Sequence, residues 1–179
     1  MPKYVAFLRA INVGGHTVKM DHLRTLFETL GLRNVETFIA SGNVIFDSAS
    51  KNTRALEKKI ETCLGEALGY NVATFIRSTA ALANIATYKP FSDAELSTEG
   101  HTLYIGLMAD SPDKAAKDKL STLATKVDDF HVNSREVYWL CRTKFSESQV
   151  SGALLAKTLG MATTLRNATT IKKIVTKYS

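Results

Sequence analysis

The sequence is poor in cysteine and has no long apolar segment. Its two cysteines, Cys63 and Cys141, lie far apart in apolar surroundings, which favours two buried thiols over a disulfide or a metal pair. No stretch approaches the roughly 20 apolar residues that span a bilayer. Arg9 interrupts the N-terminal apolar run too early for a secretory signal. We therefore expect a cytoplasmic protein that does not engage membranes.

Motifs of common catalytic and metal sites are also missing. The sequence contains neither GxSxG nor HExxH, and none of its four histidines pairs with another histidine or a cysteine at zinc-ligand spacing. Gly14-Gly15 is followed by HTVKMD rather than by the Lys-Ser/Thr of a P-loop, and GxGxxG does not occur. We expect neither a metal nor a cofactor, and whether the protein is an enzyme stays open.

The charge of the chain is uneven. A chain of 179 residues can bury a core without disulfides or metals. Residues 1–134 contain 15 basic and 15 acidic residues, whereas residues 135–179 contain 8 basic and 2 acidic ones, so the net charge of +6 arises at the C-terminal end. A basic segment attracts acidic partners, nucleic acid among them, although a solvated helix face is the simpler explanation.

The first part of the chain predicts the order strand, helix, strand, strand, helix, strand. The period of apolar residues places these elements, in chain order, at residues 3–9, 18–31, 35–40, 43–47, 52–69 and 71–77. Ser41-Gly42-Asn43 predicts a tight hairpin turn with a positive φ at Gly42. This order is typical of a ferredoxin-like unit, here followed by a short helix that Ser78 or Thr79 caps.

The second part repeats this order incompletely. Residues 88–101 are polar and interrupted by proline and glycine, so we interpret them as a linker between residues 1–87 and residues 102–179. The pattern then predicts strand, helix, strand, strand and helix, at residues 102–109, 113–124, 130–133, 136–141 and 146–160. Ser146 or Ser148 is the expected cap of that helix. A terminal helix with a basic outer face, residues 168–179, stands where a fourth strand is expected.

The predicted fold class is α+β. It consists of two ferredoxin-like βαββα(β) units packed together, with a C-terminal helix.

Three segments resemble a known family. They are LRAINVGG at residues 8–15, SGNVIF at residues 41–46 and TLRNATT at residues 164–170. These are similar to the LRGINVGG-like, SGNVVF-like and TxRNWxT-like motifs of the bacterial domain-of-unknown-function family numbered 1697. Ala10 stands where the family has glycine, and Ala168 stands where it has tryptophan. The resemblance implies an α+β fold with ferredoxin-like repeats, and it implies no activity.

Polar residues at a strand end form the first part of a candidate ligand site. The loop after the first strand contains Arg9, Asn12, Gly14 and Gly15, and glycines at such a position let an anion approach backbone N–H groups. The first and third strands of a ferredoxin-like unit are antiparallel neighbours, so we expect Arg9 and Asn12 to lie near Asn43. A plain turn and a plain hairpin are the structural alternatives.

The second part of the candidate site precedes the last helix. Asn167 or Thr169 is the expected N-cap, and Arg166 beside a helix N-terminus suits a phosphate or a carboxylate. If the last helix packs across the first unit, Arg166 joins Arg9.

Three functions remain open at this point. The favoured one is a binding module for an anionic ligand, which is a phosphorylated small molecule, a nucleotide or a nucleic acid. The second is an enzyme that acts on a small anionic substrate, with His16 or Asp21 as the nearest titratable group. The third is a structural or interaction protein that forms a homodimer through a sheet edge or the last helix.

Aromatic residues bear on the nucleic-acid alternative. Phe130, Tyr138, Trp139 and Phe145 offer rings on which nucleobases stack. Tyr138 and Trp139 are adjacent, so they point to opposite faces of a strand and at least one of them is expected in the core.

Overall fold

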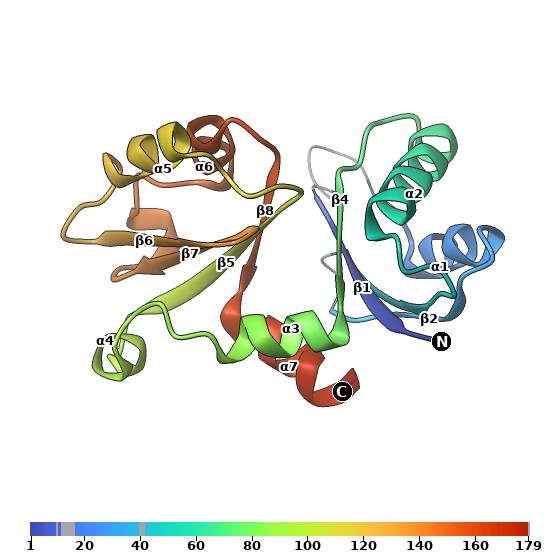
Figure 1. Cartoon of the computed structure of the whole chain (residues 1–179), viewed down its shortest axis with the longest axis horizontal. Helices are drawn as coiled ribbons and strands as arrows, with labels where there is room; N and C mark the ends of the chain where they lie inside the picture. The colour runs from blue at the N-terminus through green and yellow to red at the C-terminus, as the bar shows by residue number, and fades with distance from the viewer. Residues whose placement is uncertain (10, 12–16, 40–41, 179) are drawn as a thin grey trace. The chain divides into compact units, whose positions relative to one another are not determined.

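A computed structural model describes residues 1–9, 11, 17–39 and 42–178 (Figure 1). The chain divides into two compact units. Unit 1 comprises Met1–Leu82 together with Tyr178–Ser179, and unit 2 comprises Ala83–Lys177. Each unit contains one four-stranded antiparallel sheet, as the predicted fold class requires.

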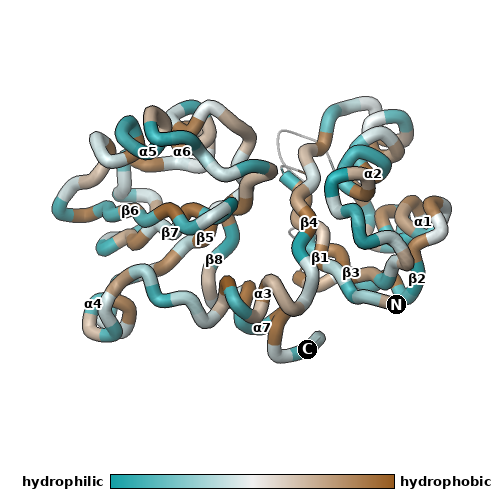
Figure 2. The backbone as a smooth tube through the Cα atoms, in the orientation of Figure 1, coloured by the Kyte–Doolittle hydropathy of each residue, from teal (hydrophilic) through white to brown (hydrophobic). Residues whose placement is uncertain are grey.

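Unit 1 has the strand order β2-β3-β1-β4. Its elements are β1 (Lys3–Leu8), α1 (Met20–Thr29), β2 (Arg33–Thr37), β3 (Asn43–Asp47), α2 (Thr53–Leu68) and β4 (Thr74–Ser78), followed by α3 (Thr79–Thr87). The first and third strands are antiparallel neighbours, so the predicted ferredoxin-like order is confirmed. Much of α2 is hydrophilic (Figure 2), because only one face, with Leu56, Ile60 and Leu64, is buried.

The β2–β3 hairpin meets the end of β1. The Leu8 amide donates a hydrogen bond to the Gly42 carbonyl at 2.8 Å. Gly42 has the predicted positive φ, +80°, and a Cβ there would lie 2.9 Å from Ile11 Cγ2. Asn43 is only 1 % exposed, and its side-chain amide donates to the Phe38 carbonyl at 3.1 Å. Asn43 therefore closes the hairpin.

Unit 2 has the strand order β6-β7-β5-β8. Its elements after α3 are α4 (Asp93–Ser97), β5 (Thr102–Met108), α5 (Lys114–Ser121), β6 (Asp128–Asn133), β7 (Glu136–Cys141), the 3-10 turn η1 (Phe145–Glu147), α6 (Gly152–Leu159), β8 (Thr163–Asn167) and α7 (Ala168–Tyr178). Helices α5 and α6 cover one face of this sheet, where Leu120 and Leu155 pack against Trp139 and Val137.

Two predictions about unit 2 were wrong. A fourth strand, β8, does precede the last helix; its sequence TTLRN is short and polar, so it gave no apolar signal. Helix α6 begins at Gly152, and its cap is Ser151, whose hydroxyl accepts the Leu154 amide at 3.1 Å. Ser148 bonds elsewhere, because its hydroxyl accepts the Val150 amide at 3.0 Å.

The segment interpreted as a linker contains helix α4, which is tied to the sheet of unit 2. The Glu95 carboxylate accepts a hydrogen bond from Arg142 Nε at 3.0 Å. The Glu95 backbone carbonyl lies 2.7 Å from His101 Nδ1. The hydrogen bond from the charged Arg142 guanidinium to the Glu95 carboxylate raises the pKa of Arg142.

Gly106 in β5 lies where the structure leaves no room for a side chain. A Cβ there would lie 2.5 Å from Val137 Cγ1 and 2.9 Å from Thr163 Cγ2. Gly106→Ala should therefore lower the free energy of unfolding by about 1–3 kcal/mol through overpacking, measured by urea denaturation. Gly152→Ala is the matched control, because its Cβ would meet Leu165 Cδ1 at an ordinary 3.6 Å. Equal stability of the two variants would contradict the prediction.

The hydrogen bond of the buried Asn43 side chain should stabilise unit 1. Asn43→Ala leaves the Phe38 carbonyl without its side-chain donor, so the free energy of unfolding should fall by about 1–3 kcal/mol. The exposed Asn71, which makes no hydrogen bond within the described part of the chain, provides the control variant Asn71→Ala. Denaturation curves of both variants check this, and a loss no larger than that of the control would refute a structural role for Asn43.

Candidate functional site

The predicted loop site of unit 1 is described only in part. Asn12, Gly14 and Gly15 lie outside the described residues, as does His16. The Arg9 amide donates to the Ala73 carbonyl at 2.9 Å, which fixes the backbone at the end of β1. The Arg9 side chain is half-buried and makes no hydrogen bond or ion pair with the part of the chain that the structure describes. Within the described residues, the Asn43 side-chain amide is therefore engaged by the Phe38 carbonyl, whereas the Arg9 guanidinium is not engaged.

Arg166 and Asn167 end strand β8 in unit 2. The Arg166 guanidinium is buried, and its Nη1 donates to Thr164 Oγ1 at 2.8 Å and to the Leu165 carbonyl at 3.0 Å. Burial lowers the pKa of Arg166 to about 10, because the charged form is poorly solvated. Asn167 accepts the Thr169 amide at 2.9 Å, as expected of a cap for α7. Arg9 and Asn43 belong to the other unit, so a joint site stays a prediction.

Two further groups considered from the sequence have ordinary positions. The Asp21 carboxylate is 90 % exposed on α1 and pairs with Arg24 Nη2 at 3.2 Å, which counts against it as an acid or base in a cleft. Tyr138 and Trp139 point to opposite faces of β7, and both are fully buried, so neither stacks on a nucleobase. Phe145 is exposed at one edge, where its ring packs on Tyr104 and Trp139.

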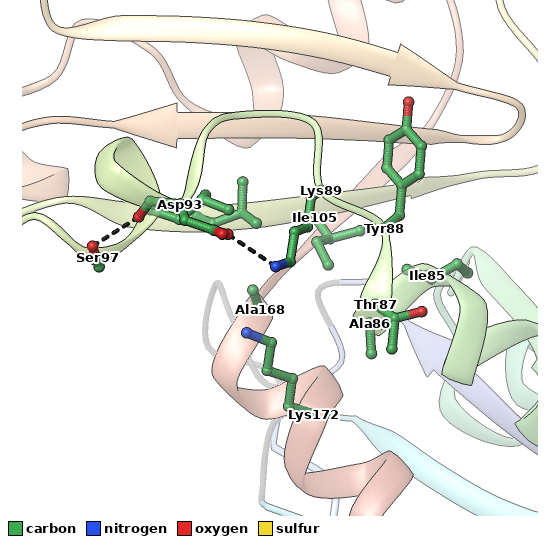
Figure 3. Close-up of a pocket in the computed structure, with 12 residues that line it drawn as sticks. Ile85, Ala86, Thr87, Tyr88, Lys89, Asp93, Ser97, Ile105, Ala168 and Lys172 are labelled. Atoms are coloured by element: carbon green, nitrogen blue, oxygen red, sulfur yellow. Dashed lines mark hydrogen bonds and ion pairs between the residues drawn. The ribbon is translucent and has the colours of Figure 1, made fainter.

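One cavity in unit 2 lies at the beginning of α7 and is called the α7 cavity here. Its volume is about 560 Å³, and its walls come from the end of α3, the segment with α4, strand β5 and the first turn of α7 (Figure 3). The apolar side chains that line it are Ile85, Ala86, Leu96, Leu103, Ile105 and Ala168. The polar ones are Thr87, Tyr88, Lys89, Asp93, Ser97 and Lys172.

The charged groups of the α7 cavity leave one amine unpaired. Lys89 Nζ lies 2.9 Å from Asp93 Oδ1, so these two charges offset each other. Lys172 is exposed, its amine lies beside the first turn of α7 (Figure 3), and it makes no ion pair with any described residue. The N-terminus of a helix carries partial positive charge. The rim of the cavity is therefore positive, while much of its wall is apolar.

Contacts of the Tyr88 side chain with His131 and Tyr138 fix one wall of this cavity. The Tyr88 hydroxyl lies 2.6 Å from His131 Nε2, and the Tyr88 ring packs on Tyr138 with centroids 5.1 Å apart. These contacts hold the chain between α3 and α4 against the sheet. Sequence reasoning missed Lys89 and Lys172 as neighbours, because more than 80 residues separate them in the chain and no short motif joins them.

Comparisons with known proteins support the fold. The solved structure of the conserved bacterial protein SP0830 from Streptococcus pneumoniae is similar, with a TM-score of 0.79 and 21 % sequence identity over 99 % of this chain and 98 % of that chain. A search of curated proteins finds no match. Within the described residues, no helix combines the length and the apolar character needed to cross a membrane.

The family resemblance is confirmed over a region that contains the first two motifs, at residues 8–15 and 41–46, and the third motif, at residues 164–170, lies outside the matched region. Residues 1–138 match the family described as a protein of unknown function, DUF1697. This match covers more than half of the chain, so the chain belongs to the DUF1697 family.

Proposed function

We propose that the protein binds a small anionic ligand and that the α7 cavity holds it. The observation that carries this proposal is the Lys172 amine, which lies beside the N-terminus of α7 at the rim of a cavity of about 560 Å³ and forms no ion pair with the described residues. This volume is within the range of small-molecule pockets, which is roughly 300–1,000 Å³. An anionic group suits the rim, because both the lysine and the helix N-terminus attract negative charge.

The lining also favours a particular type of ligand. Ile85, Leu103 and Ile105 supply apolar surface, so the ligand has an apolar or planar body in addition to its phosphate or carboxylate. A nucleotide or another phosphorylated metabolite meets both requirements. The anionic group binds beside Lys172 rather than beside Lys89, because Asp93 already neutralises Lys89.

The other functional alternatives stay predictions. They are an enzyme acting on a small anionic substrate, nucleic-acid binding by the basic segment, a homodimer and a cytoplasmic location. Binding through Arg9 and the loop that contains Asn12, Gly14 and Gly15 is the second candidate site, favoured by an Arg9 side chain that bonds to none of the described residues.

A ligand screen tests the proposal. Purified protein is screened by thermal shift against mononucleotides, dinucleotides, sugar phosphates and aromatic carboxylates, because a ligand at 100 times its Kd stabilises the fold by roughly 2.7 kcal/mol. For the best compound, Lys172→Ala should weaken binding by about tenfold, since a charge-assisted bond is lost. Isothermal titration calorimetry measures the change.

The variants Lys173→Ala and Arg9→Ala complete this test. Lys173 is an exposed neighbour on α7 that does not line the cavity, so Lys173→Ala should bind as tightly as the unaltered protein. If Arg9→Ala abolishes binding while Lys172→Ala does not, the ligand binds at the loop after β1 and the α7 cavity is the wrong site. If both Lys172→Ala and Lys173→Ala lose ligand binding and low salt restores it, the ligand is held only by general electrostatic attraction to the basic segment.

A further inference from the structure

A second cavity in unit 2 contains a buried carboxylate. It has a volume of about 440 Å³ and lies among the start of β6, the η1 turn and α6; it is called the β6 cavity here. Asp128, the first residue of β6, lines it and is only 3 % exposed. The Thr125 hydroxyl accepts the backbone amides of Val127 and Asp128, both at 3.1 Å, so the chain that presents Asp128 is fixed.

Only neutral groups bond to the Asp128 carboxylate. Trp139 Nε1 donates to Oδ1 at 2.8 Å, and the Ser148 hydroxyl lies 2.9 Å from both Oδ1 and Oδ2. Because Trp139 already donates to Oδ1, the Ser148 hydroxyl can donate to Oδ2, and the second lone pair of Oδ2 can still accept a further hydrogen bond. The adjacent Cys141 thiol donates to the Thr143 carbonyl at 3.2 Å. Burial raises the pKa of Cys141, and its interaction with the nearby Asp128 carboxylate raises it further, so the thiol is neutral as well.

The described part of the chain supplies no basic side chain that pairs with the Asp128 carboxylate. None of the described lysines, arginines or histidines forms an ion pair with Asp128. Buried charges in proteins are ordinarily paired, because the loss of hydration is costly. Among the described residues that line the β6 cavity, the ionisable ones are Asp128 and the exposed Glu147, and both are acidic.

We infer that the β6 cavity is a binding site for a protonated amine or a guanidinium group. The cation bonds to Asp128 Oδ2, and Glu147 adds attraction at the mouth of the cavity, where the Thr143 hydroxyl holds its carboxylate at 2.6 Å. Leu123, Val150 and Leu154 line the same cavity and suit the alkyl stem that carries such a group. A metal ion is the poorer fit, because the described residues contain no group of three or more His, Cys, Asp or Glu that could hold one.

The single tryptophan of the chain reports on this site. Trp139 is the only tryptophan in the sequence, and its indole N–H bonds directly to the carboxylate that takes the cation. The intact protein is titrated with butylamine, agmatine and putrescine, and the indole N–H resonance of Trp139 is followed by NMR. The amines should shift this resonance saturably, and 1-butanol, a neutral compound of similar size, should not.

Substitutions decide whether the two carboxylates are responsible. Asp128→Asn keeps an acceptor for Trp139 and Ser148 but removes the charge, so amine affinity should fall roughly tenfold or more. Glu147→Gln, at an exposed position where folding is not at risk, should weaken binding several-fold. Asp129→Asn is the matched control: its carboxylate pairs with Arg142 and does not line the β6 cavity, so affinity should stay within about twofold.

Further titrations identify the source of the cation. Peptides that carry a single lysine or arginine are compared with the free amines. A response to free amines alone assigns a small-molecule ligand, and a response to the peptides assigns the side chain of a protein partner. The inference is overturned if millimolar amines give no saturable shift, if 1-butanol gives the same shift, or if Glu147→Gln and a folded Asp128→Asn both bind as the unaltered protein does.

Discussion

Burial of the central strands on both faces of each sheet is the constraint on which the rest of the structure depends. Along β1, Val5, Ala6 and Phe7 are fully buried, and so is the run from Val137 to Cys141 in β7. Such strands have no place for a solvated polar side chain, so polar chemistry is confined to strand ends, edge strands and helices. The α7 and β6 cavities follow this rule: Lys172 comes from a helix, and Asp128 begins an edge strand.

The two units build the junction from last strand to helix in the same way. Arg77 in β4 and Arg166 in β8 occupy the fourth position of their strands, and each donates Nη1 to the carbonyl of the preceding residue at 3.0 Å. The next residue then caps the following helix: Ser78 accepts the Ala81 amide at 3.1 Å, and Asn167 accepts the Thr169 amide. The TLRN motif therefore has a structural role that its counterpart in unit 1 shares, and its role in ligand binding stays a prediction.

The sequence predicted the helices and strands that have clear apolar periodicity. It did not predict the features that depend on contacts between segments far apart in the chain. The hairpin at Gly42 and the ferredoxin-like strand order follow from turn chemistry and from period-2 and period-3.6 patterns. Strand β8 was missed because pairing with β5, rather than its own composition, makes TTLRN extended. The cavities were missed because their walls combine segments far apart in the chain, which no local pattern connects.

Net charge is a poor guide to the local charge around each cavity of this protein. The segment 135–179 carries 8 basic and only 2 acidic residues, yet Glu147, one of those two, lines an acidic cavity. Attraction by exposed lysines is screened within about 8–10 Å at physiological salt. A carboxylate buried like Asp128 is screened far less, because little water or salt surrounds it. A buried carboxylate such as that of Asp128 therefore keeps its electrostatic attraction at salt concentrations that screen the exposed lysines.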